Sequence, residues 1–292
     1  MAMTDAASLP EGTRVGRTAL LVESLEEPIE FYRDVVGLAL LSAGETTATL
    51  GVDGTPLLVL NRDEEASPRT REQAGLFHTA FSVPSRASLG DALERIRDRW
   101  RLDGASDHHV SEALYVTDPE GNGVEIYCDR PAGRWPRTDD GRVRIGTVPL
   151  DLEDVAAESS GSARMPAGTT VGHVHLEVSS LEATRAFYVD TIGLCVQTDV
   201  GSAVFLAAGD YHHHLGVNAW NDRSSPAGGR GLAWFELVVP DEESLSTVRR
   251  RLERTAATVS GRSDGFEVLD PDEIAVRFRA EPSRSERRGL EL

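Results

Sequence analysis

Residues 107–127 read DHHVSEALYVTDPEGNGVEIY, a pattern that predicts a strand, a turn rich in Pro, Gly and Asn, and a second strand. In the second strand Val124 and Ile126 flank Glu125, so Glu125 shares a face with Tyr127 rather than with the apolar pair. A carboxylate in a half-buried strand is costly unless a positive group pairs with it. An isolated Glu in such a pattern is more often a solvent-facing residue of an edge strand. Other features of the chain are therefore needed to assign a role to Glu125.

The second half of the chain repeats the first. Residues 15–22 match residues 171–178 at an offset of 156, and both segments have the apolar pattern of a strand. The same offset holds, without a gap, as far as the Gly-Leu pair at 75. After a small length change, the Asp-Pro pair at 118 matches the pair at 270.

Each half is expected to contain two βαβββ modules, which gives four modules and an α+β fold. The predicted regions are 12–130 for the first pair, 131–168 for a connecting segment rich in Pro, Gly and Ser, and 169–280 for the second pair. In the first module Ser24 is a candidate N-cap of a helix that ends at Gly37. A second helix is expected near residues 88–100.

The bulk composition suits a folded protein of a reducing compartment. The chain has 292 residues, 40% of them hydrophobic, which is enough for a substantial core. Cys128 and Cys195 lie in different halves and do not suggest a disulfide framework. No apolar run long enough to span a membrane and no signal peptide are visible, so we expect a cytoplasmic protein without a membrane partner.

The net charge of −18 excludes one class of partner. Every basic residue is Arg, since the sequence has no Lys, and so acidic a surface disfavours nucleic acid. A large negative charge also keeps proteins soluble in strong salt, so the composition indicates either a halophilic protein or a GC-rich genome acting alone.

Four segments carry a family resemblance, namely 75–78, 106–127, 172–178 and 211–218. With the four tandem modules, they resemble the vicinal oxygen chelate superfamily and, within it, extradiol ring-cleaving dioxygenases of the catechol 2,3-dioxygenase type. The resemblance covers nearly the whole chain. It implies that pairs of modules curl into two cups of mixed β-sheet, with metal ligands on the first strand of each module and on the last strand of one.

One set of these ligand positions is complete. The resemblance implies His78 and His173 on first strands and Glu125 on a last strand, in modules two and three. His175 is an alternative to His173, because both imidazoles lie on one strand face. The three side chains can converge only if module two pairs with module three across the connecting segment.

The other set is a vestige. Modules one and four have Arg17 and Trp234 at the first-strand positions, and the counterpart of Glu125 falls near Ala275. We therefore expect a single metal site.

Two imidazoles and one carboxylate, with open positions opposite, form the facial triad of non-heme Fe(II) oxygenases. The resemblance implies Fe(II), with Mn(II) as a substitute, and a small aromatic diol and O2 as substrates. It also implies catalytic roles for His213 as acid–base residue and Tyr115 as hydrogen-bond donor. His108 is the candidate pocket residue, with His109, on the opposite side of the strand, as the alternative. A neutral histidine suits proton transfer near pH 7. Without the resemblance, these residues would be a polar His cluster and an ordinary half-buried Tyr.

Two other functions compete. A glyoxalase or thiol transferase of the same superfamily would also use a metal, and Arg17 is the one hint of a cationic pocket. A metal-free binding protein of the bleomycin-resistance type would lack the ligands. Strand edges exposed in such folds also leave homo-oligomer formation open.

Overall fold

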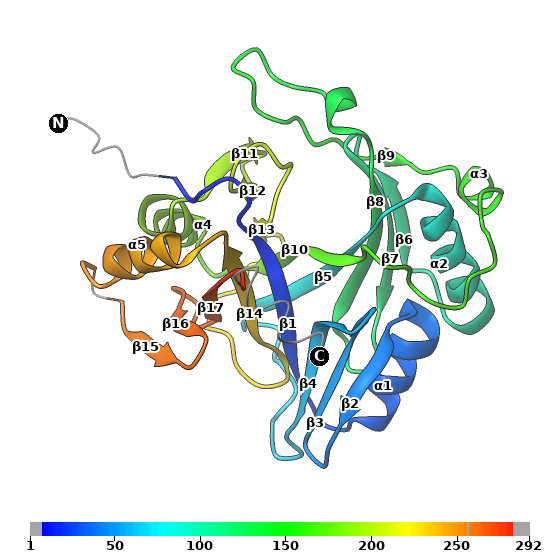
Figure 1. Ribbon diagram of the computed structural model, residues 1–292, viewed down its shortest axis with the longest axis horizontal. Helices are drawn as coiled ribbons and strands as arrows, with labels where there is room; N and C mark the ends of the chain where they lie inside the picture. Colours follow the sequence, from blue (N-terminus) through cyan, green and yellow to red (C-terminus); the bar gives the residue numbers. More distant parts are fainter. Residues whose placement is uncertain (1–7, 256, 283–292) are drawn as a thin grey trace.

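A computed structural model describes residues 8–255 and 257–282 and shows two curled, mixed β-sheets with few helices (Figure 1). The predicted α+β fold with two cups is confirmed. None of the helices in this part of the chain is long and apolar enough to cross a membrane.

Each of the four predicted modules has the expected βαβββ order. Module one comprises β1 (Arg14–Val22), α1 (Glu26–Phe31), η1 (Tyr32–Val36), β2 (Ala39–Ala43), β3 (Thr47–Val52) and β4 (Thr55–Arg62). Module two comprises β5 (Gly75–Val83), α2 (Arg86–Arg99), β6 (Gly104–Asp107), β7 (Ser111–Thr117) and β8 (Gly123–Asp129).

The second half repeats this order. Module three comprises β10 (Thr170–Glu177), α4 (Leu181–Arg185), η3 (Ala186–Ile192), β11 (Cys195–Asp199), β12 (Ala203–Ala207) and β13 (Leu215–Asn218). Module four comprises β14 (Gly231–Val239), α5 (Glu242–Leu252), β15 (Val259–Arg262), β16 (Gly265–Leu269) and β17 (Ala275–Ala280).

Each sheet combines one module from each half of the sequence. The nine-stranded sheet joins modules two and three through β5 and β10, and the eight-stranded sheet joins modules one and four through β1 and β14. The two halves therefore interleave, which is the pairing that the metal site requires. We call the sheet of modules two and three the open cup, and the sheet of modules one and four the filled cup.

The two central strand pairs have the same register. Thr18 pairs with Phe235 in the filled cup, and Val174 pairs with Thr79 in the open cup. Val174 is 156 residues after Thr18, and Phe235 is 156 residues after Thr79. The irregularities that interrupt the two ladders also fall at equivalent places. The duplication seen in the sequence is therefore a duplication of backbone geometry.

The first helices of modules one and three end at glycine, as predicted for the first. Gly37 has φ +98 and caps η1 in the left-handed region, where glycine is favoured. The N-cap of α1 is Leu25 rather than the predicted Ser24, whose Oγ accepts the Glu26 N–H. In module three Ser180 is the N-cap and accepts the Ala183 N–H.

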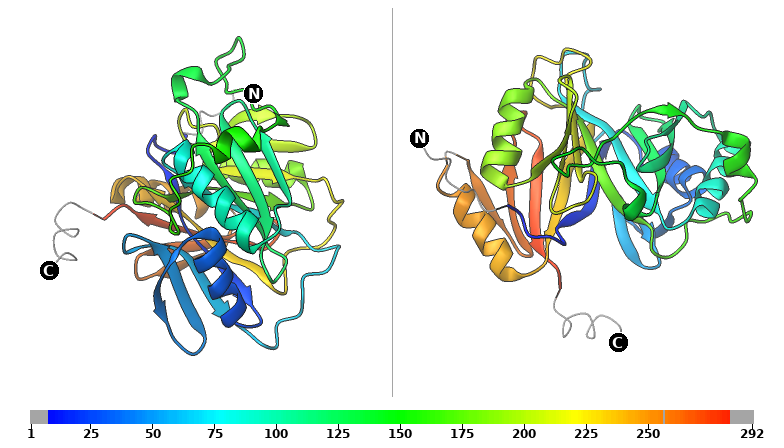
Figure 2. Two further views of the ribbon diagram at one scale, coloured as in Figure 1. Left: turned by 90° about the vertical axis from the view of Figure 1, so that its right-hand side faces the viewer. Right: turned by 90° about the horizontal axis from the view of Figure 1, so that it is seen from above.

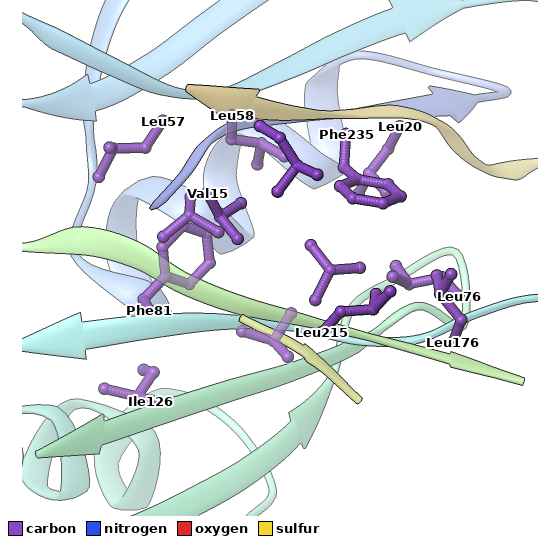
Figure 3. Packing of buried hydrophobic residues seen from close by; sticks show 14 of the residues in the cluster. Val15, Leu20, Leu57, Leu58, Leu76, Phe81, Ile126, Leu176, Leu215 and Phe235 are labelled. Atoms are coloured by element: carbon purple, nitrogen blue, oxygen red, sulfur yellow. The ribbon is translucent and has the colours of Figure 1, made fainter. Parts of the chain in front are cut away.

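The main apolar core lies between the two cups. Leu20 and Phe235 of the filled cup and Leu76 and Leu176 of the open cup are all buried and face each other in Figure 3. Because side chains alternate along a strand, the opposite faces of β5 and β10 point away from this core. That opposite face carries the site.

The connecting segment leaves β8 as a long loop and then returns to the open cup (Figure 2). It includes η2 (Ala132–Arg134), β9 (Val148–Pro149), which pairs with β6, and α3 (Leu152–Ala156), which lies against α2. Residues 131–168 are thus partly ordered against module two rather than a free linker.

Candidate metal centre

Three adjacent strands of the open cup bring the predicted ligands together. In the ladders Ala80 on the central strand β5 pairs with Glu125 on β8 and with His173 on β10. His78 lies two residues from Ala80 along β5 and so shares its face. The small side chain of Ala80 leaves the space between its neighbours to the three longer ones.

The three ligand atoms form a nearly regular triangle. Glu125 Oε2 lies 2.9 Å from His78 Nε2 and 3.2 Å from His173 Nε2, and the two Nε2 atoms are 3.3 Å apart. In octahedral coordination with bonds of about 2.1 Å, neighbouring ligand atoms are about 3.0 Å apart. The triangle therefore has the dimensions of one face of a metal octahedron, and the residues fit the implied ion.

The protonation states also suit a metal. Burial would raise the pKa of Glu125, but the neighbouring His173 and His78 outweigh it and hold the pKa well below its usual range. Burial lowers the pKa of His173 to about 4, with Glu125 offsetting part of the shift. An ionised carboxylate and a neutral imidazole are the forms that bind metal ions.

A glycine next to His173 is required by packing. A Cβ on Gly172 would stand 1.7 Å from Tyr127 Oη, so another residue would displace the tyrosine. The Tyr127 ring packs against His173 at a centroid distance of 5.1 Å and helps to fix the imidazole. Gly172 and His173, near the start of β10, are thus packed as one unit with Tyr127.

His175, the alternative ligand, is hydrogen-bonded to Asn218 instead. Asn218 Oδ1 accepts the Trp220 N–H, so its amide nitrogen must donate to His175 Nε2 at 3.1 Å. Among the described residues, the cluster of possible metal ligands contains His173 and not His175. The ring of His175 packs among Phe77, Phe205 and Trp220 instead.

The predicted acid–base residue His213 lies beside the triad. Its ring centroid is 4.0 Å from that of His173, and it lines the same cavity. Burial, followed by the charges of His173 and His212, lowers the pKa of His213 well below its usual value. His213 is therefore a neutral imidazole at pH 7 and can accept a proton.

A hydrogen-bonded chain fixes which nitrogen of His213 is free. Asp129 Oδ1 accepts from His212 Nε2 at 2.8 Å, so in neutral His212 the Nδ1 atom is an acceptor. It lies 2.7 Å from His213 Nδ1, which must then donate. The remaining atom, His213 Nε2, has its lone pair available. No sequence pattern indicated these contacts of Asp129 and His212.

Residues 211–214 lie in the loop between β12 and β13 and not in a strand. The three histidines have separate partners. His212 binds Asp129, His213 lines the cavity, and His214 Nδ1 accepts the Ala208 N–H at 3.2 Å. Loop geometry, not a two-residue repeat, separates them.

Tyr115 and His108 form a second chain on the cavity wall. His108 Nδ1 lies 2.8 Å from the Gly146 carbonyl and must donate to it, so in the neutral ring Nε2 accepts from Tyr115 Oη at 2.7 Å. Burial, and then the charge of Glu125, raises the pKa of Tyr115 well above its usual value and keeps the hydroxyl protonated. The connecting segment thus holds His108, and His108 orients Tyr115.

All six predicted site residues line one cavity of about 400 Å³ in the open cup. This is a volume typical of small-molecule sites. Ile145, Gly146 and Thr147 of the connecting segment also line it, which the sequence did not indicate. The other lining residues are Phe77, Ser106, Val110, Ser111, His175, Val200, Phe205 and Trp220.

Among the residues that the structure describes, the filled cup has no cluster of metal ligands at the corresponding place. Glu236 pairs with Arg277 in the β14–β17 ladder, as Ala80 pairs with Glu125, so the counterpart of Glu125 is Arg277. The expected position near Ala275 is wrong by two residues. The Arg277 guanidinium stacks on the Trp234 ring, 3.8 Å from its centroid.

Comparison with known proteins agrees with this geometry. Residues 14–126 match the family model of the glyoxalase/bleomycin resistance protein/dioxygenase superfamily. The chain is 35% identical over 273 residues to a catechol-2,3-dioxygenase of Bacillus subtilis, covering 90% of this chain and 96% of the relative. A metallothiol transferase FosB of Lysinibacillus sphaericus is 32% identical over 113 residues, 36% of this chain and 75% of that protein.

Solved structures share the fold. A putative dioxygenase of Bacillus subtilis superposes with a TM-score of 0.63 at 14% identity, covering 92% of this chain and 86% of that one. Glyoxalase I of Zea mays superposes with a TM-score of 0.57 at 16% identity, covering 92% of both chains. With 35% identity across nearly its whole length to a named ring-cleaving enzyme, the chain belongs to the vicinal oxygen chelate superfamily and, within it, to the extradiol ring-cleaving dioxygenases.

Proposed function

We propose that this protein cleaves the ring of a catechol next to the diol, with O2 as co-substrate and Fe(II), or Mn(II) as a substitute, held by His78, Glu125 and His173. The observation that carries the proposal is the triangle of these three ligand atoms opening into a cavity that also contains His213 and Tyr115. When bound, the metal would supply a chelation site for the diol and a path for electrons between the ring and dioxygen.

The residues around the triad have separable tasks. His213 Nε2 accepts a proton from a diol hydroxyl and can return it to an oxygen that becomes basic later in the reaction. The Tyr115 hydroxyl stays protonated, and it can donate to negative charge that develops on the substrate when it turns from its present acceptor, His108 Nε2. His108 orients that hydroxyl through its own bond to Gly146.

Two features weigh against the other functions. A thiol transferase acting on an anionic substrate needs a free cation in its cavity, but Arg17 lies in the filled cup and pairs with buried Glu236 at 2.7 Å. A metal-free binding protein has no need for a buried carboxylate that faces two imidazoles 2.9 and 3.2 Å away.

The test is oxygen uptake by the metal-loaded protein. Protein reconstituted anaerobically with Fe(II), and separately with Mn(II), is mixed with catechol in aerated buffer while an oxygen electrode and the absorbance of a yellow ring-fission product are followed. We expect one O2 consumed for each catechol cleaved. Metal-loaded protein that consumes no O2 with catechol or with any alkyl catechol would contradict the proposal.

A further inference from the structure

One wall of the cavity is a continuous aromatic surface. The His175 ring packs against Phe77, Trp220 and Phe205 at centroid distances of 5.2, 5.4 and 5.7 Å, and Phe77 also contacts Trp220 at 5.4 Å. These rings lie beyond the three metal ligands. A diol chelated at the triad therefore has its ring carbons next to aromatic and not polar groups.

The remaining apolar contacts come from three separate segments. Val110 follows the turn after β6, Ile145 belongs to the connecting segment, and Val200 lies in the turn between β11 and β12. Val200 is 57% exposed, so it stands at the solvent side of the cavity. A substituent on the ring would be enclosed by these side chains.

Apart from a metal ion at the triad, whose open positions the diol itself would take, the cavity offers no cation to a carboxylate on the substrate ring. Among its lining residues, all of which the structure describes, none is Arg, and the chain contains no Lys. His108 has both ring nitrogens engaged, by Gly146 and Tyr115, and His175 Nε2 is held by Asn218. Glu125 is the one carboxylate in the lining, and it adds negative charge.

We propose that this cavity selects uncharged catechols whose ring carries an apolar alkyl or aryl substituent, and that it rejects catechols that carry a carboxylate. The inference rests on the proposed function and names its substrate class. A carboxylate in this cavity would lose its hydration without gaining a partner, which is costly. The net charge of −18 adds long-range repulsion of anions.

The test compares shape-matched substrates that differ in charge. The first pair is 4-isopropylcatechol and 3,4-dihydroxybenzoate, and the second is 3-isopropylcatechol and 2,3-dihydroxybenzoate. We measure kcat/KM in air with the Fe(II)-loaded protein and, separately, anaerobic affinity by calorimetry. Both are repeated in about 1 M NaCl, where the screening length is about 3 Å and long-range repulsion is suppressed. For the isopropyl isomer that the protein prefers, we expect kcat/KM and anaerobic affinity each to be at least about 100-fold higher than for the carboxylate of the same pair.

Two variants locate the effect. Val200→Arg places a guanidinium at the exposed side of the cavity, and we expect it to reduce the preference for the isopropyl compound at least about 10-fold. Leu269→Arg makes the same change of net charge at a side chain 51% exposed on β16 of the filled cup, and should leave the preference unchanged. Circular dichroism establishes that both variants are folded.

The outcomes separate this inference from the proposed function. Anaerobic binding that prefers the isopropyl compounds, without cleavage of any catechol, would support the ligand class and overturn the ring-cleaving activity. Equal affinity for both members of each pair would overturn the ligand class, whether or not cleavage occurs. A preference that Val200→Arg changes no more than Leu269→Arg does would also overturn it.

Discussion

The two cups place different residues at three equivalent points of one β framework. Where the open cup has His173 and His78 on its first strands, the filled cup has Arg17 and Trp234. Glu125 in the open cup is replaced by Arg277. In the filled cup a guanidinium lies on an aromatic ring and the carboxylate of Glu267 binds it at 2.7 Å, so side chains satisfy one another without an ion.

The loops between the last two strands of modules one and three also differ between the cups. In the filled cup β3 and β4 are joined by a tight turn at Asp53–Gly54, and β4 continues over eight residues. In the open cup a longer loop with three histidines separates β12 from β13, which is a strand of four residues. The open cup therefore has a shorter strand at this point, and its longer loop places His213 at the cavity. If the proposed function holds, the duplicated fold uses the open cup for chemistry, while the side chains of the filled cup pair with one another.

The largest difference between the cups is expected in metal binding. His78→Ala, Glu125→Ala and His173→Ala each remove one of three ligands, so each should lose bound iron and all oxygen uptake with catechol. Trp234→Phe, at the point equivalent to His78, should keep one metal per chain. Iron content after Fe(II) loading and desalting is the measurement. If all three alanine variants retain one iron per chain, the ligand assignment is wrong.

A smaller loss of activity is expected when the proton-transfer group is removed and the metal ligands are kept. His213→Asn deletes the free imidazole nitrogen beside the triad and should lower kcat by about 10²- to 10⁴-fold, the usual contribution of a general acid–base group. Iron content should stay at one per chain. His214→Gln, in the same loop but bound to the Ala208 N–H, is the matched control and should change kcat little. Equal losses in both variants would indicate loop disruption rather than acid–base catalysis.

The acid sensitivity of the fold should also differ between the cups, because all eight histidines lie in modules two and three. Burial lowers the pKa of His214 to about 3, whereas an unfolded histidine has a pKa of about 6.5. Between these values the unfolded chain binds a proton that the folded chain does not, so stability falls as pH falls through this range. In the filled cup burial raises the pKa of Asp270 to about 6, which acts with the opposite sign.

His214→Gln should therefore lose less stability in acid than the unmodified protein. From pH 7 to pH 4.5 the difference in unfolding free energy should reach about 3 kcal/mol, at 1.36 kcal/mol for each pH unit of the shift. Urea unfolding at the two pH values measures it. An identical acid loss in both proteins would show that His214 is not buried as a neutral group.

The sequence predicted the framework from its internal repeat and strand patterns, and the family resemblance supplied the three candidate ligands. Strand alternation put Glu125 on its face, and the offset of 156 aligned His173 with Arg17 and His78 with Trp234. Arg277 was missed although the offset is already 152 at the Asp-Pro pair, because this offset, which gives 277 when applied to Glu125, was not carried on to the last strand. The sheet register places Arg277 at the same point.

Other parts of the site depend on contacts between distant loops. Asp129 reaches His212 across 83 positions, and Gly146 binds His108 across 38. No periodic pattern encodes such contacts, since loops have no fixed spacing between side chains that share a direction. The same holds for Ile145 and Val200 in the cavity wall. The sequence and the family resemblance could therefore indicate the candidate metal ligands, but not the groups that would orient and enclose a substrate.

Breaking the hydrogen-bonded chain from Asp129 through His212 to His213 should lower kcat by about 10-fold. Asp129→Asn keeps the size of the side chain but replaces the carboxylate that accepts from His212, so the preferred tautomers of His212 and His213 are no longer fixed. Partners of this kind typically contribute 10- to 100-fold in activity. We expect a lower kcat, an altered pH profile and unchanged iron content. A kcat and pH profile equal to those of the unmodified protein would mean that the chain of hydrogen bonds has no role.

The smallest effect is expected in the filled cup. Arg277→Ala removes a guanidinium from the Trp234 ring and from Glu267, contacts that together contribute about 1–2 kcal/mol. Arg277→Lys keeps the positive charge over the ring but not the planar stacking, so it should retain about half of that stability. Both variants should keep full iron content and unchanged oxygen uptake, because the open cup is untouched. A loss of ring cleavage in Arg277→Ala comparable to that in Glu125→Ala, measured beside urea unfolding, would show that the two cups do not divide stability from chemistry.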